Sequence, residues 1–227
     1  MSLKNRLQVV RITSPRLREL ALKVLVRVYR EEKGWTQDIE AFLPAEDLER
    51  EDVAWFGVLL DNRRMLGVTR LLYRIPMNLY HSYDFQLVDP GMDVEAFIRN
   101  NRIAEVGRFA VLPKYRRRFR VAAALMRTVG FDAMNRGFTH FITDVFEEDP
   151  NTPYGFHRRV LGFQVVATHE VGELNCKSRR VTMLLDLRAA QERLGHEKGW
   201  FWRFLNANCP EAAELTATQP ILETAAS

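Results

Sequence analysis

The chain has 227 residues, of which 47% are hydrophobic and 27% are charged, and its net charge is +4. This composition is typical of a globular protein with a sizeable core, and the mild positive charge argues against a protein that coats nucleic acid. No stretch approaches the roughly 20 apolar residues that span a bilayer, and the N-terminal residues lack the order of a signal peptide. We therefore expect a soluble, cytoplasmic protein.

The two cysteines, Cys176 and Cys209, have neither metal-ligand nor redox spacing. No cluster of His, Cys and Asp has metal-ligand spacing either, so we expect no metal. Neither cysteine nor any serine lies in a nucleophile motif, which argues against covalent catalysis.

The first predicted element is a helix over residues 15–33, where apolar side chains recur at helical spacing. Ser14 before Pro15 is typical of a helix start, and Gly34 is expected to end the helix. Two strand-like runs, 54–60 and 65–73, follow on either side of the turn-forming "DNRR" and predict a hairpin.

After a mixed segment with a short helix at 94–101, residues 105–112 are predicted to form a strand that Pro113 ends. The segment 120–137 predicts a strong helix, with Gly137 as its stop. A strand at 138–146, a short helix at 151–162, and strands at 163–168 and 181–187 complete the pattern.

This order of elements indicates an α/β protein with a mixed sheet and helices on its faces. Strand character is lost after residue 187. We expect one domain over residues 1–187, followed by a C-terminal helical extension and flexible tail over 188–227.

The strand, basic turn and helix of 105–137 resemble the GNAT superfamily of acyltransferases. That family's signature is Arg/Gln-x-x-Gly-x-Gly/Ala, and "RRFRVA" matches it at Arg117 and Ala122, with Arg120 in place of the first glycine. "NTPYGFHRRVLGF" resembles the family's second motif, an Asn-led helix that closes with Gly-Phe. The resemblance implies a GNAT-like, mostly antiparallel mixed sheet with helices on both faces.

A second resemblance, over 27–111, is to the acyl-homoserine-lactone (autoinducer) synthases within that superfamily. "RVYREEKGW" is similar to their N-terminal element, "GVTRLL" to their Gly-x-x-Arg-Leu strand, and "EVGRFAV" to their Glu-x-Ser-Arg-Phe-Ala-Val, with Gly107 replacing Ser. The long-chain N-acyl amino acid synthases share this layout, and the turn "YRRRFRV" and helix "HRRVLGF" resemble that branch more closely.

Members of that branch move a fatty acyl group from acyl carrier protein (ACP) to the amine of an amino acid. The resemblance thus implies an N-acyltransferase with acyl-ACP or acyl-CoA as co-substrate, a small amine as acceptor and no tightly bound cofactor. The alternatives are an ordinary acetyl-CoA or acyl-CoA N-acetyltransferase and a catalytically silent, acyl-ACP-binding regulator.

For the acyl donor, the resemblance implies that the strand backbone at Phe109, Ala110 and Val111 runs beside pantetheine, and that a strand N–H near Phe109 or Val111 meets the oxyanion. The helix N-terminus after the basic turn is suited to a phosphate. We expect the turn to bind ACP and its phosphopantetheine through Arg116, Arg117, Arg118, Arg120 and Ala122. A solvated basic turn is the alternative.

Glu105 and Arg108 are the catalytic candidates. An α-amine has an ordinary pKa of about 7.7–8.0 and must lose a proton before it attacks a thioester, and a carboxylate such as Glu105 can take that proton. The alternative is a salt bridge from Glu105 to Arg108 or Arg70. Strict alternation places Glu105 and Arg108 on opposite faces of the strand, so we predict a bulge at Gly107 that brings both toward one cleft.

The candidates for binding the acceptor are Arg27, Arg70, Tyr29 and Trp35. A planar guanidinium suits a carboxylate, although an ion pair with acidic residues near 46–52 is an alternative for the two arginines. Tyr29 and Trp35 either contact the acceptor or pack the N-terminal helix. His140 and His157 are expected to be structural. "GWFWRFL" at 199–205 is a candidate for peripheral membrane contact or self-association, or packs on the domain.

Overall fold

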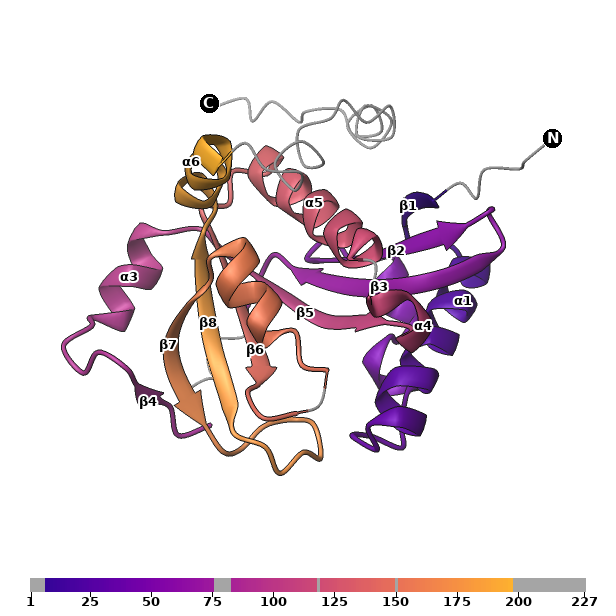
Figure 1. The fold of residues 1–227 in the computed structure, drawn as a ribbon, viewed down its shortest axis with the longest axis horizontal. Helices are drawn as coiled ribbons and strands as arrows, with labels where there is room; N and C mark the ends of the chain where they lie inside the picture. The colour runs from indigo at the N-terminus through magenta and orange to yellow at the C-terminus, as the bar shows by residue number, and fades with distance from the viewer. Residues whose placement is uncertain (1–6, 76–82, 118, 150, 198–227) are drawn as a thin grey trace, which may run out of the picture.

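The computed structural model describes residues 7–75, 83–117, 119–149 and 151–197, and the strands described form one sheet (Figure 1). The strands lie in the order β1-β2-β3-β5-β6-β8-β7-β4. Their bounds are β1 (Leu7–Arg11), β2 (Val53–Leu60), β3 (Arg64–Leu72), β4 (Gln86–Leu87), β5 (Ile103–Val111), β6 (His140–Phe146), β7 (Gln164–His169) and β8 (Arg180–Asp186). Every neighbouring pair is antiparallel except β5 and β6. The expected mixed, mostly antiparallel α/β sheet is confirmed.

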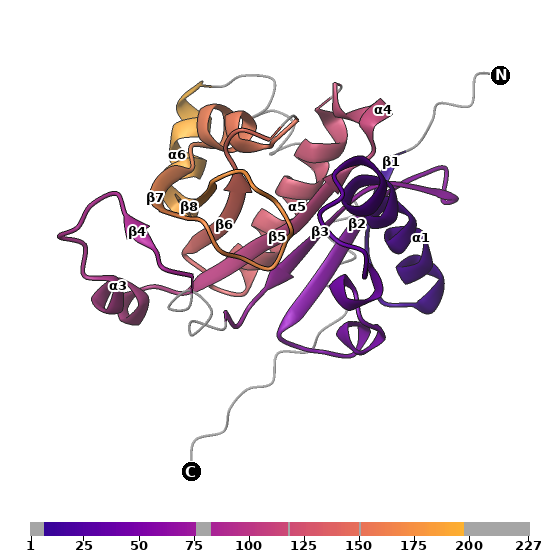
Figure 2. The same ribbon diagram turned by 90° about the horizontal axis from the view of Figure 1, so that it is seen from below.

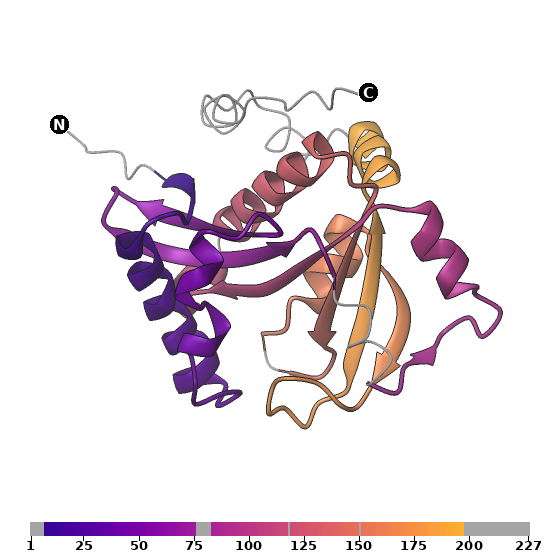
Figure 3. The same ribbon diagram turned by 180° about the vertical axis from the view of Figure 1, so that it is seen from behind.

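Helices cover both faces of this sheet, with α5 on one face and α1 on the other (Figures 1 and 3). The helical elements are α1 (Pro15–Leu25), the π-helix η1 (Val26–Glu32), the 3-10 turns η2 (Glu40–Phe42) and η3 (Ala45–Leu48), α3 (Val94–Asn100), α4 (Pro113–Arg116), α5 (Arg120–Asn135), the π-helix η4 (Phe156–Leu161) and α6 (Leu187–Glu197). Figure 2 shows α3 and β4 at the end of the sheet opposite to α1.

The core consists of two layers, one on each side of the sheet. Leu125 and Val129 of α5 pack on one face, while Leu25 of α1 packs on the other. Adjacent residues of β2 contribute to different layers: Phe56 packs in the α5 layer and Trp55 in the α1 layer. Burial on both faces explains why β2 is a continuous apolar run rather than an alternating one.

Local signals in the sequence explain the N-terminal elements. Ser14 Oγ accepts a hydrogen bond from the Leu17 backbone N–H at 3.4 Å and caps α1, and Gly34 adopts a φ of 63° after the helix ends. Asp61 and Asn62 have φ values of 52° and 56° in the β2–β3 turn. Two such residues in succession are typical of a tight hairpin turn, so the predicted helix start and hairpin are confirmed.

Other elements differ from the expectation. The helix predicted over 15–33 is not uniform, because after Leu25 it continues as the π-helix η1, whose wider turn buries the adjacent Val28 and Tyr29. The sequence did not predict β1, β4 or α4. The strands are short, with five and two residues, so their periodicity is too brief to detect. The proposed boundary at residue 187 coincides with the start of α6, and residues 199–205 lie outside the described residues.

The sheet opens between its two parallel strands. β5 and β6 are paired only from Ile103 and His140 to Glu105 and Ile142. Beyond that point they diverge, and Figures 1 and 3 show β5 running toward α4 while β6 turns away with β8. On its other side β5 remains paired with β3, through Gly107, Ala110 and Val111.

Candidate active site

A cavity lies where β5 and β6 separate. Strand β5 contributes Glu105, Arg108 and Phe109 to its wall, and β6 contributes Asp144 and Phe146. Further lining residues come from η1 and the turn after it, from the segment before β4, from η4, and from β7 to the start of β8: Tyr29, Trp35, Tyr83, His157, His169, Glu173 and Arg180. The cavity therefore joins residues that are far apart in the sequence.

A β-bulge gives β5 its unusual arrangement of side chains. The register of β3 and β5 shifts between Val68 and Arg70, and Arg108 has a φ of 50°, which is uncommon for a residue other than glycine. Before the bulge, Val106 packs in the α5 layer; after it, Ala110 packs in the α1 layer, although strict alternation would return it to the α5 layer.

As a result, Glu105 and Arg108 both line the cavity. Strand β5 does carry a bulge that brings both side chains to one cavity, but the prediction that Gly107 hosts it is wrong. Gly107 pairs regularly with Arg70 and has no positive φ, and the distortion falls at Arg108.

Glu105 forms an ion pair with Arg70, with 2.8 Å between Oε1 and Nη2. The two side chains lie across Gly107: a Cβ built on this glycine would lie 2.9 Å from Glu105 Oε1 and 3.4 Å from Arg70 Nη2. A glycine at this position leaves room for the ion pair. The alternative salt bridge considered for Glu105 is thus present, with Arg70 as its partner rather than Arg108.

Arg108 is largely buried, with 12% of its side chain exposed. Its guanidinium pairs with Glu173 and lies 4.0 Å from the centre of the Phe42 ring. Burial lowers the pKa of Arg108, and the nearby positive charge of Arg70 adds to this effect. The buried Nε atoms of Arg70 and Arg108 have no hydrogen-bond partner, so each retains a donor.

Tyr29 and Trp35 form an aromatic wall of the cavity, with their ring centres 5.3 Å apart in an edge-to-face arrangement. Burial raises the pKa of Tyr29 to about 12, although Arg108 and Arg70 act in the opposite direction. Trp35 also packs on Phe146 of β6, and the Lys33–Asp149 ion pair connects the same two segments. Tyr29 and Trp35 therefore both line the cavity and pack the N-terminal helix.

The opposite wall carries an acidic residue and a histidine. Asp144 Oδ1 accepts a hydrogen bond from Thr182 Oγ1 at 2.6 Å. His169 is buried, its ring stacks against those of Tyr83 and Phe85, and its Nε2 lies 3.4 Å from Asp144 Oδ2. Burial and the surrounding charges of Glu173, Asp144 and Glu105 raise the pKa of Tyr83.

No family model matches the sequence, and no curated protein matches it. The fold does have solved counterparts. An N-acyl amino acid synthase from uncultured soil microbes, FeeM, is similar with a TM-score of 0.62 and 19% identity, over 88% of this chain and 99% of the other. The chain has the GNAT fold.

Two acetyltransferase structures are similar as well. The ribosomal-protein-S18-alanine N-acetyltransferase from Escherichia coli has a TM-score of 0.55 and 14% identity, over 80% of this chain and 94% of the other. An aminoglycoside 6'-N-acetyltransferase complexed with coenzyme A has a TM-score of 0.54 and 10% identity, over 80% and 97%. These neighbours confirm the GNAT-like architecture that the sequence motifs predicted.

Within this GNAT fold, the basic turn lies between α4 and α5 and its arginines have different surroundings. Arg116 points back to the protein, where it makes two contacts with the carboxylate of Glu32, at 2.5 and 2.6 Å, and donates from Nε to the Val111 carbonyl at 2.8 Å. Arg117 and Arg120 are exposed. Arg118 lies outside the described residues.

The other donor candidates follow Arg108 on β5 or lie in the first turn of α5. Phe109 lines the cavity, edge-on to His157 at 6.0 Å between ring centres. Ala110 and Val111 are buried, and Ala122 is half-buried against the α5 core. In the first turn of α5, the buried residues are Val121 and Ala123 rather than Ala122.

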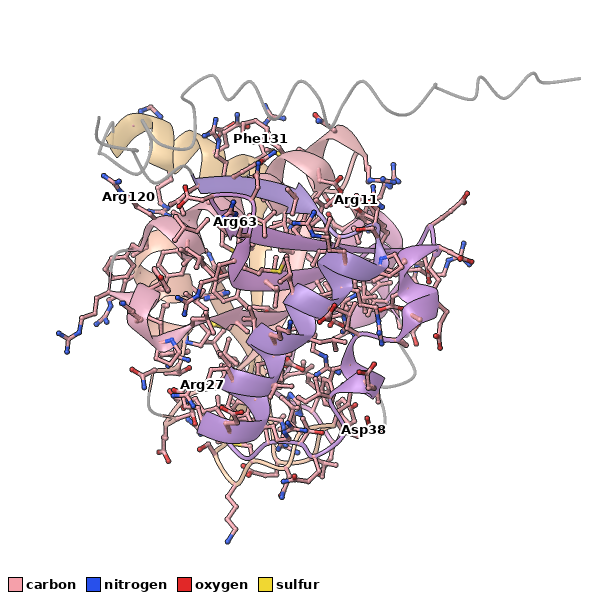
Figure 4. All side chains as sticks on the ribbon, turned by 90° about the vertical axis from the view of Figure 1, so that its right-hand side faces the viewer. Arg11, Arg27, Asp38, Arg63, Arg120 and Phe131 are labelled. Carbon is pink, nitrogen blue, oxygen red and sulfur yellow. The ribbon has the colours of Figure 1, made fainter. Side chains whose placement is uncertain are left out.

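Arg27 does not join the acceptor candidates at the cavity. It forms an exposed ion pair with Glu31 one turn further along η1, at 2.9 Å. Figure 4 shows Arg27 on the outer surface of the N-terminal helix, well separated from Arg120. The acidic partners near 46–52 considered for Arg27 and Arg70 are engaged elsewhere, since Asp47 and Asp52 pair with Arg50.

The histidines considered as structural are held by nearby groups. His157 is buried and its Nδ1 lies 2.9 Å from the Pro153 carbonyl. Burial lowers the pKa of His157 to about 4. Burial also lowers the pKa of His140, whose Nδ1 lies 2.9 Å from Thr139 Oγ1.

Sequence reasoning missed Asp144, His169, Tyr83 and Glu173. One signal was available, because Asp144 is a charged residue within the apolar strand run "FITDVF". The other three come from strand ends and connecting segments, whose approach to β5 depends on the sheet order. Among the residues that the structure describes, no cluster of side chains could hold a metal ion and no helix has the length and hydropathy of a membrane span.

Proposed function

We propose that the protein is an N-acyltransferase that moves a fatty acyl group from ACP to the amine of an amino acid or an amino-acid derivative. The observation that carries the proposal is the bulged strand β5 at the separation from β6, with Glu105 and Arg108 on one cavity wall. The fold of the solved neighbours and the sequence motifs of 27–111 support the same reaction class.

The strand supplies the means of binding the donor. Beyond Glu105, β5 is no longer paired with β6, so its backbone groups on that edge are available to an extended thioester arm. Such an arm hydrogen-bonds much as an added strand does. A backbone N–H near Phe109 or Val111 then meets the oxyanion of the tetrahedral intermediate. The aromatic lining of Trp35, Phe109 and Phe146 excludes water and strengthens these contacts.

Arg108 supplies the means of binding the acceptor. Its buried Nε has no hydrogen-bond partner, and a guanidinium binds a carboxylate through parallel N–H donors. Because Glu105 holds Arg70 beside Gly107, Arg70 places a second positive charge behind this wall. An acceptor with a carboxylate near its amine fits this environment. The role of Glu105 as proton acceptor remains a prediction.

The basic turn favours ACP as the donor. Arg120 replaces the glycine that would let the backbone approach a nucleotide pyrophosphate, and Arg117 and Arg120 are exposed for an acidic carrier. An acetyl-CoA-dependent or acyl-CoA-dependent N-acetyltransferase is the second candidate, because one neighbour of this fold is complexed with coenzyme A.

The test is a comparison of donors. The protein is incubated with acyl-ACP of several chain lengths, the matching acyl-CoA and acetyl-CoA, each with a mixture of amino acids, and N-acyl products are measured by mass. We expect N-acyl amino acids from acyl-ACP at the highest rate. Product from acetyl-CoA alone would favour the second candidate, and no product from any donor would contradict both.

A further inference from the structure

The cavity contains three carboxylates with different partners. Glu105 is paired with Arg70, and Glu173 is paired with Arg108. A carboxylate that serves as counterion to a buried arginine loses that ion pair when it takes a proton, which makes proton uptake unfavourable. Asp144 instead faces the hydroxyl of Thr182 and the imidazole of His169.

The imidazole of His169 has a defined tautomer. Its Nδ1 lies 2.7 Å from the carbonyl oxygen of Val171, an acceptor, so Nδ1 carries a proton and donates it. In the neutral ring, Nε2 is therefore the proton-accepting nitrogen. This atom is buried, lacks a hydrogen-bond partner and lies 3.4 Å from Asp144 Oδ2.

Both residues of the pair line the cavity, but their side chains differ in exposure. The Asp144 side chain is 33% exposed, whereas that of His169 is 1% exposed. The stacked rings of Tyr83 and Phe85 restrict the imidazole. A substrate in the cavity can therefore reach the Asp144 carboxylate more readily than the buried imidazole of His169.

We propose that Asp144, backed by His169, is the group that takes the proton from the acceptor amine. This inference rests on the proposed function and assigns a role that sequence reasoning gave to Glu105. Asp144 contacts the ammonium group and is the catalytic residue, whereas His169 is the positioning residue that receives the proton at Nε2.

The step balances as follows. An N–H bond of the ammonium breaks, its electron pair stays on nitrogen, and the proton passes through Asp144 to His169 Nε2. The nitrogen lone pair forms the N–C bond, and the C–S bond breaks with its electrons on sulfur. The second proton that nitrogen loses protonates the thiolate, and the first returns from His169 through Asp144 to solvent. The products are amide, free thiol and one proton.

Other charged and titratable groups face this pair. Arg180 on β8 lines the same cavity, and Tyr83, which stacks on His169, is influenced by the charges of Glu173, Glu105 and Arg108. These groups stay unchanged in the variants that test Asp144 and His169, so their field is the same in each comparison.

The test compares Asp144→Asn, His169→Gln and Glu105→Gln with two acceptors, alanine and aminooxyacetate. Both acceptors have a carboxylate, but the aminooxy nitrogen is already unprotonated at neutral pH and does not need a base for its first deprotonation. Asp186→Asn is the control, because Asp186 on β8 faces His140 on the neighbouring β6 at 4.0 Å, and neither residue is among those that line the cavity. Circular dichroism and thermal unfolding check that each variant is folded.

We expect Asp144→Asn to lower kcat/KM for alanine by about 100-fold, as is typical for loss of acid–base catalysis. His169→Gln should cause a smaller loss in the same direction. Both losses should be much smaller with aminooxyacetate, and for alanine they should shrink as the pH rises and the free amine forms. A merely structural role for His169 would lower the rates with both acceptors equally. The Asp186→Asn variant should match the wild type.

The inference is overturned if the folded Asp144→Asn variant has the wild-type kcat/KM for alanine. It is also overturned if kcat/KM of this variant falls by the same factor with both acceptors. A loss specific to alanine in Glu105→Gln and not in Asp144→Asn would return the role to Glu105. If the wild type makes no N-acyl product from any donor, the proposed function itself fails, and this inference fails with it.

Discussion

Arg108 lies on the same side of β5 as Glu105, three positions away, because the backbone at Arg108 adopts a φ of 50°. A regular strand would separate these side chains by the full thickness of the sheet. The bulge thus places a guanidinium and a carboxylate on one wall of the cavity. Backbone strain of this kind is often found at functional sites, where the surrounding structure holds it in place.

Gly107 is expected to be required for activity rather than for folding. In Gly107→Ala the new methyl meets the Glu105–Arg70 ion pair, whose side-chain ends must shift. We predict an unfolding free energy within about 1 kcal/mol of the wild type, and a fall in kcat/KM of roughly 10- to 100-fold from misplaced groups. Urea unfolding and initial rates check this.

Gly130→Ala is the control for that variant. Gly130 lies within α5, and a Cβ there would have no heavy atom within 4 Å. This substitution should stabilise the protein by about 0.5–1 kcal/mol and leave the rate unchanged. If Gly107→Ala has wild-type activity, the ion pair has no part in the site.

The exposed arginines of the basic turn are predicted to bind the carrier protein. Reversing both charges, in Arg117→Glu combined with Arg120→Glu, should lower kcat/KM for acyl-ACP roughly tenfold and weaken its dependence on salt. Acyl-pantetheine has neither carrier nor phosphate, so its kcat/KM should hardly change.

Arg188→Glu on α6 is the matched control, because Arg188 is an exposed residue paired only one turn along its own helix. It reverses one charge, as each substitution of the double variant does, and α6 lies at the end of α5 opposite to α4 (Figure 1). If the double variant loses kcat/KM by the same factor with acyl-ACP and with acyl-pantetheine, a role of Arg117 and Arg120 in binding the carrier protein is contradicted.

His157 is predicted to make stability depend on pH. Its pKa is about 4 in the folded protein, below the ordinary value of 6.5, because burial disfavours the charged ring. Between these values the unfolded chain binds more protons, so the free energy of unfolding falls as the pH is lowered from 6.5 to 4. The loss is about 3 kcal/mol at most.

Urea unfolding across this pH range measures the effect. In His157→Gln the side chain cannot titrate, so the pH slope should be smaller even though the variant is less stable. His196→Gln is the control, since His196 is exposed on α6, and it should keep the wild-type slope. An unchanged slope in His157→Gln would contradict this account of the buried ring.

Periodicity and helix caps predicted most of the fold. The hairpin followed from two apolar runs around "DNRR", and the long helix after Pro113 followed from its apolar stripe. The sequence did not predict β1 and β4, because strands of five and two residues carry almost no periodicity. It did not predict the π-helix either, since a wider turn changes the backbone without changing the type of residue.

The sequence predicted only the part of the site that is formed by residues of a single strand, β5. Glu105 and Arg108 were expected from their motif. A bulge beside them was expected because strict alternation along β5 would place the two side chains on opposite faces of the sheet. Asp144 and His169 were not, since they meet only because β7 pairs with β8 and β8 with β6. Arg27 was expected at the site from its motif, but its side chain lies on the outer surface of η1.

The most direct measurement of the central claim is the preference for a carboxylate in the acceptor. The kcat/KM for alanine is compared with that for ethylamine, its decarboxylated counterpart, in the wild type and in Arg108→Lys. Lysine keeps the charge but loses the parallel donors, so the preference for alanine should be strong in the wild type and fall roughly 10- to 100-fold in the variant. An equal preference in both proteins, or no N-acyl product from the wild type, would contradict the account.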